Sequence, residues 1–225
     1  MKHVILFDID GTLLSTGGAG QRAMERALHT AFDLDDHAHD IPAAGRTDRA
    51  ITQDLFQLHG IADETANRTR FWDEYLQHLP GTLAELDGRV LPGVFELLEI
   101  LVQRGDTAVG LLTGNLQRGA ALKLRHYRLD HHFRFGGYGD EHFHRDDVAR
   151  LALLEASRFL DRNLSPESIS VVGDTPSDVR CARAIGARAV AVTTGMYTRS
   201  ELQSAAPACL LDDFSDPHDC LRQLV

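Results

Sequence analysis

The sequence predicts an α/β fold, a parallel sheet flanked by helices with an all-helical insertion, and three observations support this. The run from Val4 to Phe7 is continuously apolar and ends at Asp8, as in a strand buried on both faces of a parallel sheet. Three further apolar runs, 107–112, 169–172 and 189–192, each lead into small or polar residues. Helical patterns separate the runs, and this alternation indicates a Rossmann-like parallel sheet core.

The helices between the runs are predicted from spacing and from end signals. Apolar residues from Val94 to Val102 recur at helical intervals, and the segment from Leu151 to Leu160 has a similar pattern. After the third run, Thr175 is suited to cap a helix and Pro176 to occupy its first position, while Gly186 is suited to end it. We therefore expect helices at these three places.

Residues 16–83 interrupt this alternation with helical spacing and no convincing strand. The segment begins at the glycine-containing stretch 15–18 and ends near Pro80 and Gly81, where the chain can change direction. We expect a core domain of residues 1–15 and 84–225, and a helical cap domain of residues 16–83. The helical spacing is carried by Met24, Ala27, Leu28, Ala31 and Phe32, by Ile51 and Leu55, and by Phe71 and Tyr75.

Composition and charge restrict the class of partner. The 225 residues include 23 Lys and Arg against 33 Asp and Glu, a formal net charge of −10, and 43% of them are hydrophobic. Such an acidic chain repels nucleic acid and anionic lipid, so neither is an expected partner. No apolar stretch approaches the ~20 residues that span a bilayer, and the apolar start is too short for a signal peptide. A small molecule is the expected partner.

The cysteines indicate the compartment. Cys181, Cys209 and Cys220 are odd in number and lack metal-ligand spacing, which favours a reducing environment. The cytoplasm is therefore the expected location. The surface pattern does not predict an oligomeric state.

Polar residues end the predicted strands and should meet at one edge of the sheet, where ligands bind in α/β folds. Asp8, Asp10 and Asp174 bring three carboxylates there, and Thr113 adds a hydroxyl. Carboxylates this close repel one another unless their pKa values rise or a cation binds. Because oxygen ligands favour a hard ion, Mg²⁺ is the expected cofactor.

Three segments follow predicted strands in order: DIDGTL from Asp8, LTGN from Leu112 and GDTPSD from Gly173. Together they resemble the first, second and fourth motifs of the haloacid dehalogenase superfamily, and the resemblance spans most of the core. It implies a Rossmann-like core with an inserted helical cap of the C1 type. It also implies a Mg²⁺-dependent phosphatase, similar to phosphoglycolate phosphatases, that forms an aspartyl phosphate and hydrolyses it.

The resemblance further implies roles for the motif residues. Asp8 would attack phosphorus, while Asp10 would protonate the leaving group and then activate water. Asp8, the backbone of Asp10, and Asp174 would hold Mg²⁺, and Asp178 would orient water at the metal or cap its helix. Phosphate would be bound by three residues at a helix start, namely Thr113, Gly114 and Asn115.

The third motif of the superfamily departs from its usual pattern here. It usually holds a lysine, but the chain contains only Lys2 and Lys123. We expect Lys123 to be a solvent-exposed charge on a helix face. A branch of the superfamily has Asp-Arg in that motif, and the segment 139–146 resembles it, so Arg145 is the expected cation, ahead of Arg134 and Arg150. The alternative for Arg145 is a surface salt bridge.

The predicted cap offers one candidate substrate contact. Arg46 lies in the segment 45–49, which resembles cap residues that face the substrate, although Thr47 or Asp48 could equally begin a helix there. The aromatic residues Phe71, Trp72 and Tyr75 are expected in the core of the cap. The histidine pairs His37/His39 and His142/His144 are expected to be polar residues of solvated loops and not metal ligands.

Two other functions stay open. A phosphosugar mutase would keep both Asp8 and Asp10, but the lysine expected in its cap is missing from residues 16–83. A metal-binding regulatory module without turnover would fit the unusual third motif. The favoured prediction is hydrolysis of a small phosphorylated metabolite, with phosphoglycolate as the family-level expectation.

Overall fold

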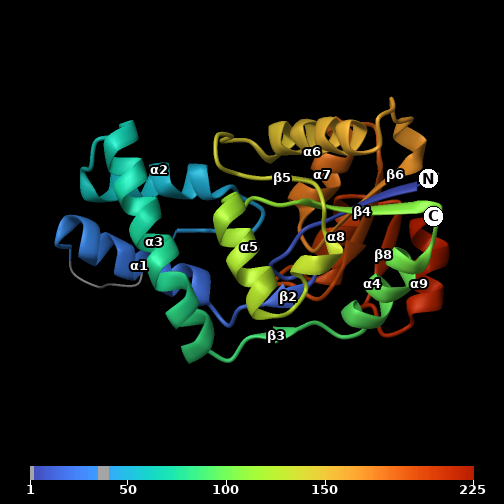
Figure 1. The fold of residues 1–225 in the computed structure, drawn as a ribbon, viewed down its shortest axis with the longest axis horizontal. Coiled ribbons are helices and arrows are strands. Elements are labelled where there is room, and N and C mark those ends of the chain that lie inside the picture. Colours follow the sequence, from blue (N-terminus) through green and yellow to red (C-terminus); the bar gives the residue numbers. More distant parts are fainter. Residues whose placement is uncertain (1–2, 35–40) are drawn as a thin grey trace.

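The computed structural model describes residues 3–34 and 41–225, and the segment with His37 and His39 lies outside this part. The predicted α/β fold is confirmed: six parallel strands form one sheet with helices on both of its faces (Figure 1). The strands are β1 (His3–Phe7), β4 (Thr107–Leu112), β5 (Gly136–Gly137), β6 (Ile169–Gly173), β7 (Arg188–Val192) and β8 (Cys209–Leu211). Their order in the sheet is β5-β4-β1-β6-β7-β8.

Strand β1 explains why its sequence is continuously apolar. Its side chains alternate between two hydrophobic clusters, with Ile5 and Phe7 on one face of the sheet and Val4 and Leu6 on the other. The first face is covered by α4 (Val94–Gln103), α5 (Gln117–His126) and α9 (Pro217–Leu224), and the second by α6 (Arg145–Phe159), α7 (Pro176–Ala184) and α8 (Arg199–Ser204). Two short 3-10 helices complete this part, η1 (Asp130–His132) and η2 (Pro166–Ser168).

The four predicted strands are confirmed, and two strands of the sheet were not predicted. Strand β5 consists of two glycines and β8 of three residues, so neither carries the apolar run by which buried strands are identified. The helix after Asp174 begins as predicted: Thr175 and Asp178 form a reciprocal capping box, and Pro176 is its first residue.

Residues 19–34 and 41–85 form a separate part of the structure beside the sheet. Helices α1 (Ala19–Phe32), α2 (Asp48–His59) and α3 (Thr65–Glu85) pack around a separate apolar cluster, and we call these three helices the helical unit (Figure 1). A two-stranded antiparallel ribbon, β2 (Leu14–Ser15) and β3 (Arg89–Val90), brackets it.

Two details of the helical unit bear on the predictions. Phe71 and Tyr75 are buried in its core and Trp72 packs against it, as expected. The break expected near Pro80 is wrong, because α3 continues through Pro80 to Glu85. The buried neighbours Leu79 and Leu83 supply packing that compensates for the hydrogen bond a proline cannot make.

Two findings concern the surroundings of the protein. Within residues 3–34 and 41–225, none of the helices combines the length and the apolar character needed to cross a bilayer. All three cysteines carry free thiols.

Candidate active site

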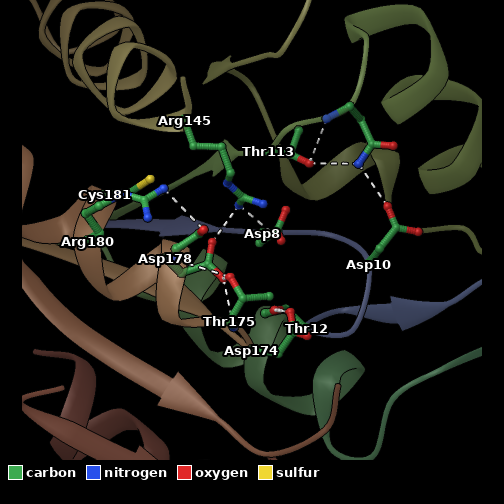
Figure 2. Close-up of polar contacts among 12 residues, drawn as sticks. Asp8, Asp10, Thr12, Thr113, Arg145, Asp174, Thr175, Asp178, Arg180 and Cys181 are labelled. Atoms are coloured by element: carbon green, nitrogen blue, oxygen red, sulfur yellow. Dashed lines mark hydrogen bonds and ion pairs between the residues drawn. The ribbon is translucent and has the colours of Figure 1, made fainter. Parts of the chain in front are cut away.

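A cavity of about 550 Å³ lies between the sheet and the helical unit. Its sheet side is formed by residues that follow three neighbouring strands: Asp8 and Asp10 after β1, Asn115 after β4 and Asp174 after β6. The strand ends therefore bring these residues to one edge of the sheet, as expected for a parallel sheet, and Figure 2 shows Asp8, Asp10 and Asp174 there.

Asp8 lies in a buried ion-pair network at the end of β1. Arg145, the first residue of α6, places its Nη2 atom 3.1 Å from Asp8 Oδ2 and 2.5 Å from Asp178 Oδ1. All three residues are at least 95% buried. Burial raises the pKa of Asp8 to about 6, and the Arg145 guanidinium opposes the rise. Arg145 is thus a buried cation beside Asp8 and not part of a surface salt bridge.

Asp174 completes a group of three buried acids. Its Oδ1 atom accepts a hydrogen bond of 3.0 Å from the Thr12 hydroxyl, a contact that sequence analysis missed. Gly11 turns the chain here with a φ of 81°, and a Cβ atom at that position would overlap the Asp174 carboxylate. Burial raises the pKa of Asp174 well above its usual value, and the carboxylates of Asp178 and Asp8 raise it further.

The acid group fits a divalent cation. One carboxylate oxygen each from Asp8, Asp174 and Asp178 lies within 4.8 Å of the others. Burial first, and then the neighbouring carboxylates, raise the pKa of Asp174, and a bound cation with oxygen ligands would offset both costs. Asp178 already has partners for both of its oxygens. Its Oδ2 atom accepts hydrogen bonds from the backbone amide and the hydroxyl of Thr175, which caps α7, and its Oδ1 atom pairs with Arg145.

Asp10 faces away from this group and has its own cation. Lys123 Nζ on α5 lies 2.6 Å from Asp10 Oδ2 and donates a second hydrogen bond of 2.6 Å to Asn115 Oδ1. The Asn115 amide nitrogen in turn donates to Asp10 Oδ2 at 2.8 Å. The expectation that Lys123 is solvent-exposed is wrong, since the residue is 5% exposed and lines the cavity.

The position of Lys123 carried a signal in the sequence. On α5 it shares one buried face with Gly119, Ala120 and Leu124, at the spacing of neighbours on a helix. A lysine on the apolar face of a helix that begins at the catalytic edge of a sheet points into the crevice. Hydrophobic spacing alone treats such a lysine as surface, which explains the error.

The predicted phosphate-binding segment is present but partly engaged. Thr113 is fully buried, and its hydroxyl oxygen accepts from the backbone and side chain of Asn115. Gly114 lines the cavity, and a Cβ atom there would overlap the Arg46 carbonyl oxygen. Two amides at the start of α5 are not available to an anion, because Leu116 N and Gln117 N donate to carboxylates.

Asp48 supplies one of those carboxylates and joins the helical unit to the sheet domain. Thr47 caps α2, and Asp48 follows it as the first residue of the helix. The Asp48 Oδ2 atom accepts from Leu116 N at 2.7 Å, and its own backbone amide donates to Gly114 O at 2.7 Å. Burial raises the pKa of Asp48 to about 6, with Lys123 opposing the rise.

Arg46 borders the cavity, but its guanidinium is engaged within the helical unit. Its Nη2 atom lies 2.7 Å from Asp54 Oδ2, and Nη1 donates to the Pro42 carbonyl oxygen at 3.2 Å. A substrate contact would have to compete with Asp54. Of the two other arginines considered for the third motif, Arg134 is exposed and Arg150 pairs with Asp147 on the exposed side of α6, and neither lines the cavity.

Comparisons with known proteins identify the family of the chain. The family model described as "Haloacid dehalogenase-like hydrolase" matches residues 5–192. A protein of Dickeya dadantii (strain 3937) named "Probable phosphatase IndB" is 28% identical over 218 residues, covering 96% of this chain and 92% of that protein. A phosphoglycolate phosphatase of Rhodospirillum rubrum is 28% identical over 233 residues, covering 98% and 91% of the two chains.

A solved structure has the same fold. The crystal structure of CbbY from Rhodobacter sphaeroides in complex with phosphate superposes with a TM-score of 0.74 at 23% identity, covering 96% of each chain. The family model matches residues 5–192 of the 225, which is most of the chain. The chain therefore belongs to the haloacid dehalogenase-like hydrolase family.

Proposed function

We propose that this hydrolase is a Mg²⁺-dependent phosphatase that acts on a small phosphorylated metabolite through an aspartyl phosphate on Asp8. The observation that carries the proposal is that the two acids of the first motif form ion pairs with two different cations. Asp8 pairs with Arg145 in a buried network, while Asp10 pairs with Lys123. Two carboxylates in different environments suit two different chemical roles.

In this proposal Asp8 is the nucleophile. It stands on a rigid strand end and is held by Arg145, so its carboxylate oxygen is oriented toward the cavity without a large entropic cost. Mg²⁺ would be held by Asp8 and Asp174, with the backbone of Asp10 as the family resemblance implies, and when bound it would neutralise charge on the phosphoryl group. Arg145 carries a fixed positive charge beside the same oxygens.

Asp10 is the proposed general acid and base. Its side chain is 38% exposed and lines the cavity, so it can reach the leaving oxygen and afterwards a water molecule. Lys123 and Asn115 hold it in place by hydrogen bonds of 2.6 and 2.8 Å. Asp178, which pairs with Arg145, is a positioning residue in this scheme, and Thr113, Gly114 and Asn115 form the phosphate-facing segment.

The helical unit is the proposed cap domain, with the predicted extent of residues 16–83 continued to Glu85 by the end of α3, and the rest of the chain as the core. Its contacts with the core through Asp48 close the cavity from above and would exclude water from the reaction. The free thiols support a cytoplasmic location. A phosphosugar mutase remains the enzymatic alternative, and a metal-binding module without turnover the non-enzymatic one.

Hydrolysis of p-nitrophenyl phosphate tests the proposal. We expect Mg²⁺-dependent release of phosphate by the wild type and its loss in Asp8→Asn. Asp219→Asn, an exposed acid paired with Arg222, is the matched control and should keep the wild-type rate. A wild-type rate in Asp8→Asn, or binding of Mg²⁺ without any product, would contradict the proposal.

A further inference from the structure

The cavity reaches beyond the acids into the helical unit, where its walls are largely apolar. Met24 from α1, Ile51 and Leu55 from α2, and Tyr75 from α3 line this inner part, together with Ile41. The total volume of about 550 Å³ falls within the ~300–1,000 Å³ of pockets that hold drug-sized ligands. The phosphoryl group of a monoester takes only a small part of it, so room remains for a leaving group much larger than glycolate.

A buried acid faces the inner cavity. Glu25 on α1 is 6% exposed and lines the cavity with Gln21, whose amide nitrogen donates to Glu25 Oε1 at 3.1 Å. Arg22 Nη1 lies 3.2 Å from the other oxygen, but Arg22 is not among the residues that line the cavity. The group that the helical unit presents to a ligand at this point is therefore a hydrogen-bond acceptor.

A donor lies in the same wall. Tyr75 is 1% exposed, and burial together with the charges of Asp48 and Asp10 raises its pKa well above its usual value. A tyrosine hydroxyl is protonated at neutral pH even at its ordinary pKa, and Tyr75 lines the cavity, so its hydroxyl can donate a hydrogen bond to a ligand. Glu25 and Tyr75 together suit the hydroxyl groups of an uncharged ligand, which both donate and accept.

The cations that line the cavity are already matched with acids. Among the described lining residues they are Arg46, Lys123 and Arg145, and their partners are respectively Asp54, Asp10, and Asp8 with Asp178. Two of these cations lie at the phosphoryl end. A second anionic group in the inner cavity would therefore be buried near Glu25 with no described cation free of an acid partner, which is costly.

We propose that the leaving group is an uncharged, hydroxyl-bearing organic group of sugar or nucleoside size, and that Glu25 is the residue that disfavours carboxylate-bearing esters. The inference rests on the proposed phosphatase function and narrows its substrate class. It moves the preferred substrate away from phosphoglycolate, because the carboxylate of that ester would meet the Glu25 acceptor. Tyr75 contributes a donor to the same hydroxyl-bearing group.

Matched ester pairs test the inference. Hydroxyethyl phosphate and phosphoglycolate differ only in a hydroxymethyl group against a carboxylate, as do glycerol phosphate and phosphoglycerate. We expect the wild type to have a kcat/KM at least about tenfold higher for the uncharged member of each pair. Uridine monophosphate, with a larger uncharged leaving group, should be hydrolysed more efficiently than either small ester.

The variant Glu25→Gln keeps the shape of the side chain and removes its charge. It should reduce the preference within each pair by about tenfold, mainly by lowering KM for the carboxylate-bearing ester. Glu85→Gln is the control, since Glu85 also pairs with an arginine of α1, Arg26, but does not line the cavity. It should leave the preference unchanged.

The possible results distinguish failure of this substrate preference from failure of the proposed phosphatase function. A wild-type preference for phosphoglycolate, or an unchanged preference in Glu25→Gln, would overturn the inference while leaving the phosphatase proposal in place. If no ester is hydrolysed, the proposed function fails; calorimetric binding of the same ester pairs with Mg²⁺ then still decides the inference. Equal affinity for both members of each pair would overturn it. The wild-type comparison does not depend on the folding of any variant.

Discussion

The two acids of the first motif pair with different cations, Asp8 with Arg145 and Asp10 with Lys123. Arg145 is buried between Asp8 and Asp178, so its removal would leave two acids without their counter-charge in a site of low solvent exposure. Breaking a buried pair by removing one partner typically costs about 3–5 kcal/mol. The same guanidinium also carries charge toward the phosphoryl position. Stability and turnover should therefore fall together when it is lost.

We predict that Arg145→Ala lowers the free energy of unfolding by about 3–5 kcal/mol and abolishes phosphatase turnover. Arg145→Lys keeps the charge but not the reach to both acids, so it should recover part of the stability and little of the rate. Arg150→Ala, on the exposed side of the same helix, should change neither. Urea denaturation and initial rates measure both quantities, and retained activity in Arg145→Ala would show that the assignment is wrong.

Lys123 orients the proposed general acid. In Lys123→Met the Asp10 carboxylate loses its ion pair, so we expect kcat for an alkyl phosphate to fall by about 100-fold. An ester with a good leaving group, p-nitrophenyl phosphate, needs less protonation and should lose less. A purely structural role of Lys123 would lower both rates equally. Arg118→Met, an exposed position on the same helix, is the control.

Sequence analysis found some of these residues and missed others for a physical reason. Asp8 and Asp174 end apolar strands, and a strand end is visible in one dimension. Lys123, Thr12 and Asp48 act across the fold, and only the tertiary structure brings them to the site. The apolar face of α5 did mark Lys123, but a charge on such a face contradicts the usual reading of helical periodicity.

At the scale of elements, the N-terminus of α2 docks onto the N-terminus of α5. Asp48 caps α5 through Leu116 N, and α2 approaches so closely that a side chain at Gly114 would overlap the Arg46 carbonyl. Two amides at the start of α5 are occupied by acids, Leu116 N by Asp48 of the helical unit and Gln117 N by Asp140. The strength of the α2–α5 contact depends on the charge of a buried acid, so it should depend on pH.

Asp48 has a raised pKa in the folded protein, about 6 against an ordinary value of 3.8. Its protonated form is therefore favoured by folding, so its contribution to stability is complete below the ordinary pKa and is lost as the pH rises through about 6. The gap between the two values corresponds to about 3 kcal/mol. We predict that the stability of the wild type relative to Asp48→Asn falls by about this amount between about pH 4 and pH 7.

Urea denaturation across this pH range measures the difference. Asp73→Asn is the control, because Asp73 also joins the helical unit to α5, through Arg118, but is exposed. Its stability relative to the wild type should be nearly constant with pH. A constant difference for Asp48→Asn as well, or one that grows with pH, would show that burial does not govern this contact.

The secondary structure elements were predictable where one local signal sufficed. The capping box of α7 and the apolar strands β1, β4, β6 and β7 all lie where the sequence indicates them. The end of α3 does not lie where the sequence indicates it, because tertiary packing overrides the local preference of Pro80. The edge strands β5 and β8 are short and depend on their neighbours in the sheet, which no local pattern encodes.

At the scale of the whole molecule, three acids from two strands and one helix hold like charges close together. Without a metal ion the repulsion among these acids opposes folding. A metal ion that binds only the folded protein favours folding by linkage. We predict that Mg²⁺ raises the melting temperature of the wild type, by roughly 2–4 °C per kcal/mol of binding free energy. Asp174→Asn should be at least as stable as the wild type in chelator and less stable than it in saturating Mg²⁺. An unchanged order would remove the metal from the account.

Locating the phosphoryl group on the protein during turnover tests directly whether Asp8 forms an aspartyl phosphate. The Asp10→Asn variant, mixed with Mg²⁺ and p-nitrophenyl phosphate and quenched in acid, should accumulate phosphoenzyme, because this leaving group needs little protonation whereas hydrolysis of the intermediate needs the base. Peptide mapping by mass spectrometry should find the phosphate on Asp8, and the Asp8→Asn/Asp10→Asn double variant should carry none. Phosphate on another residue, or turnover with no phosphorylated peptide in any variant, would contradict the account.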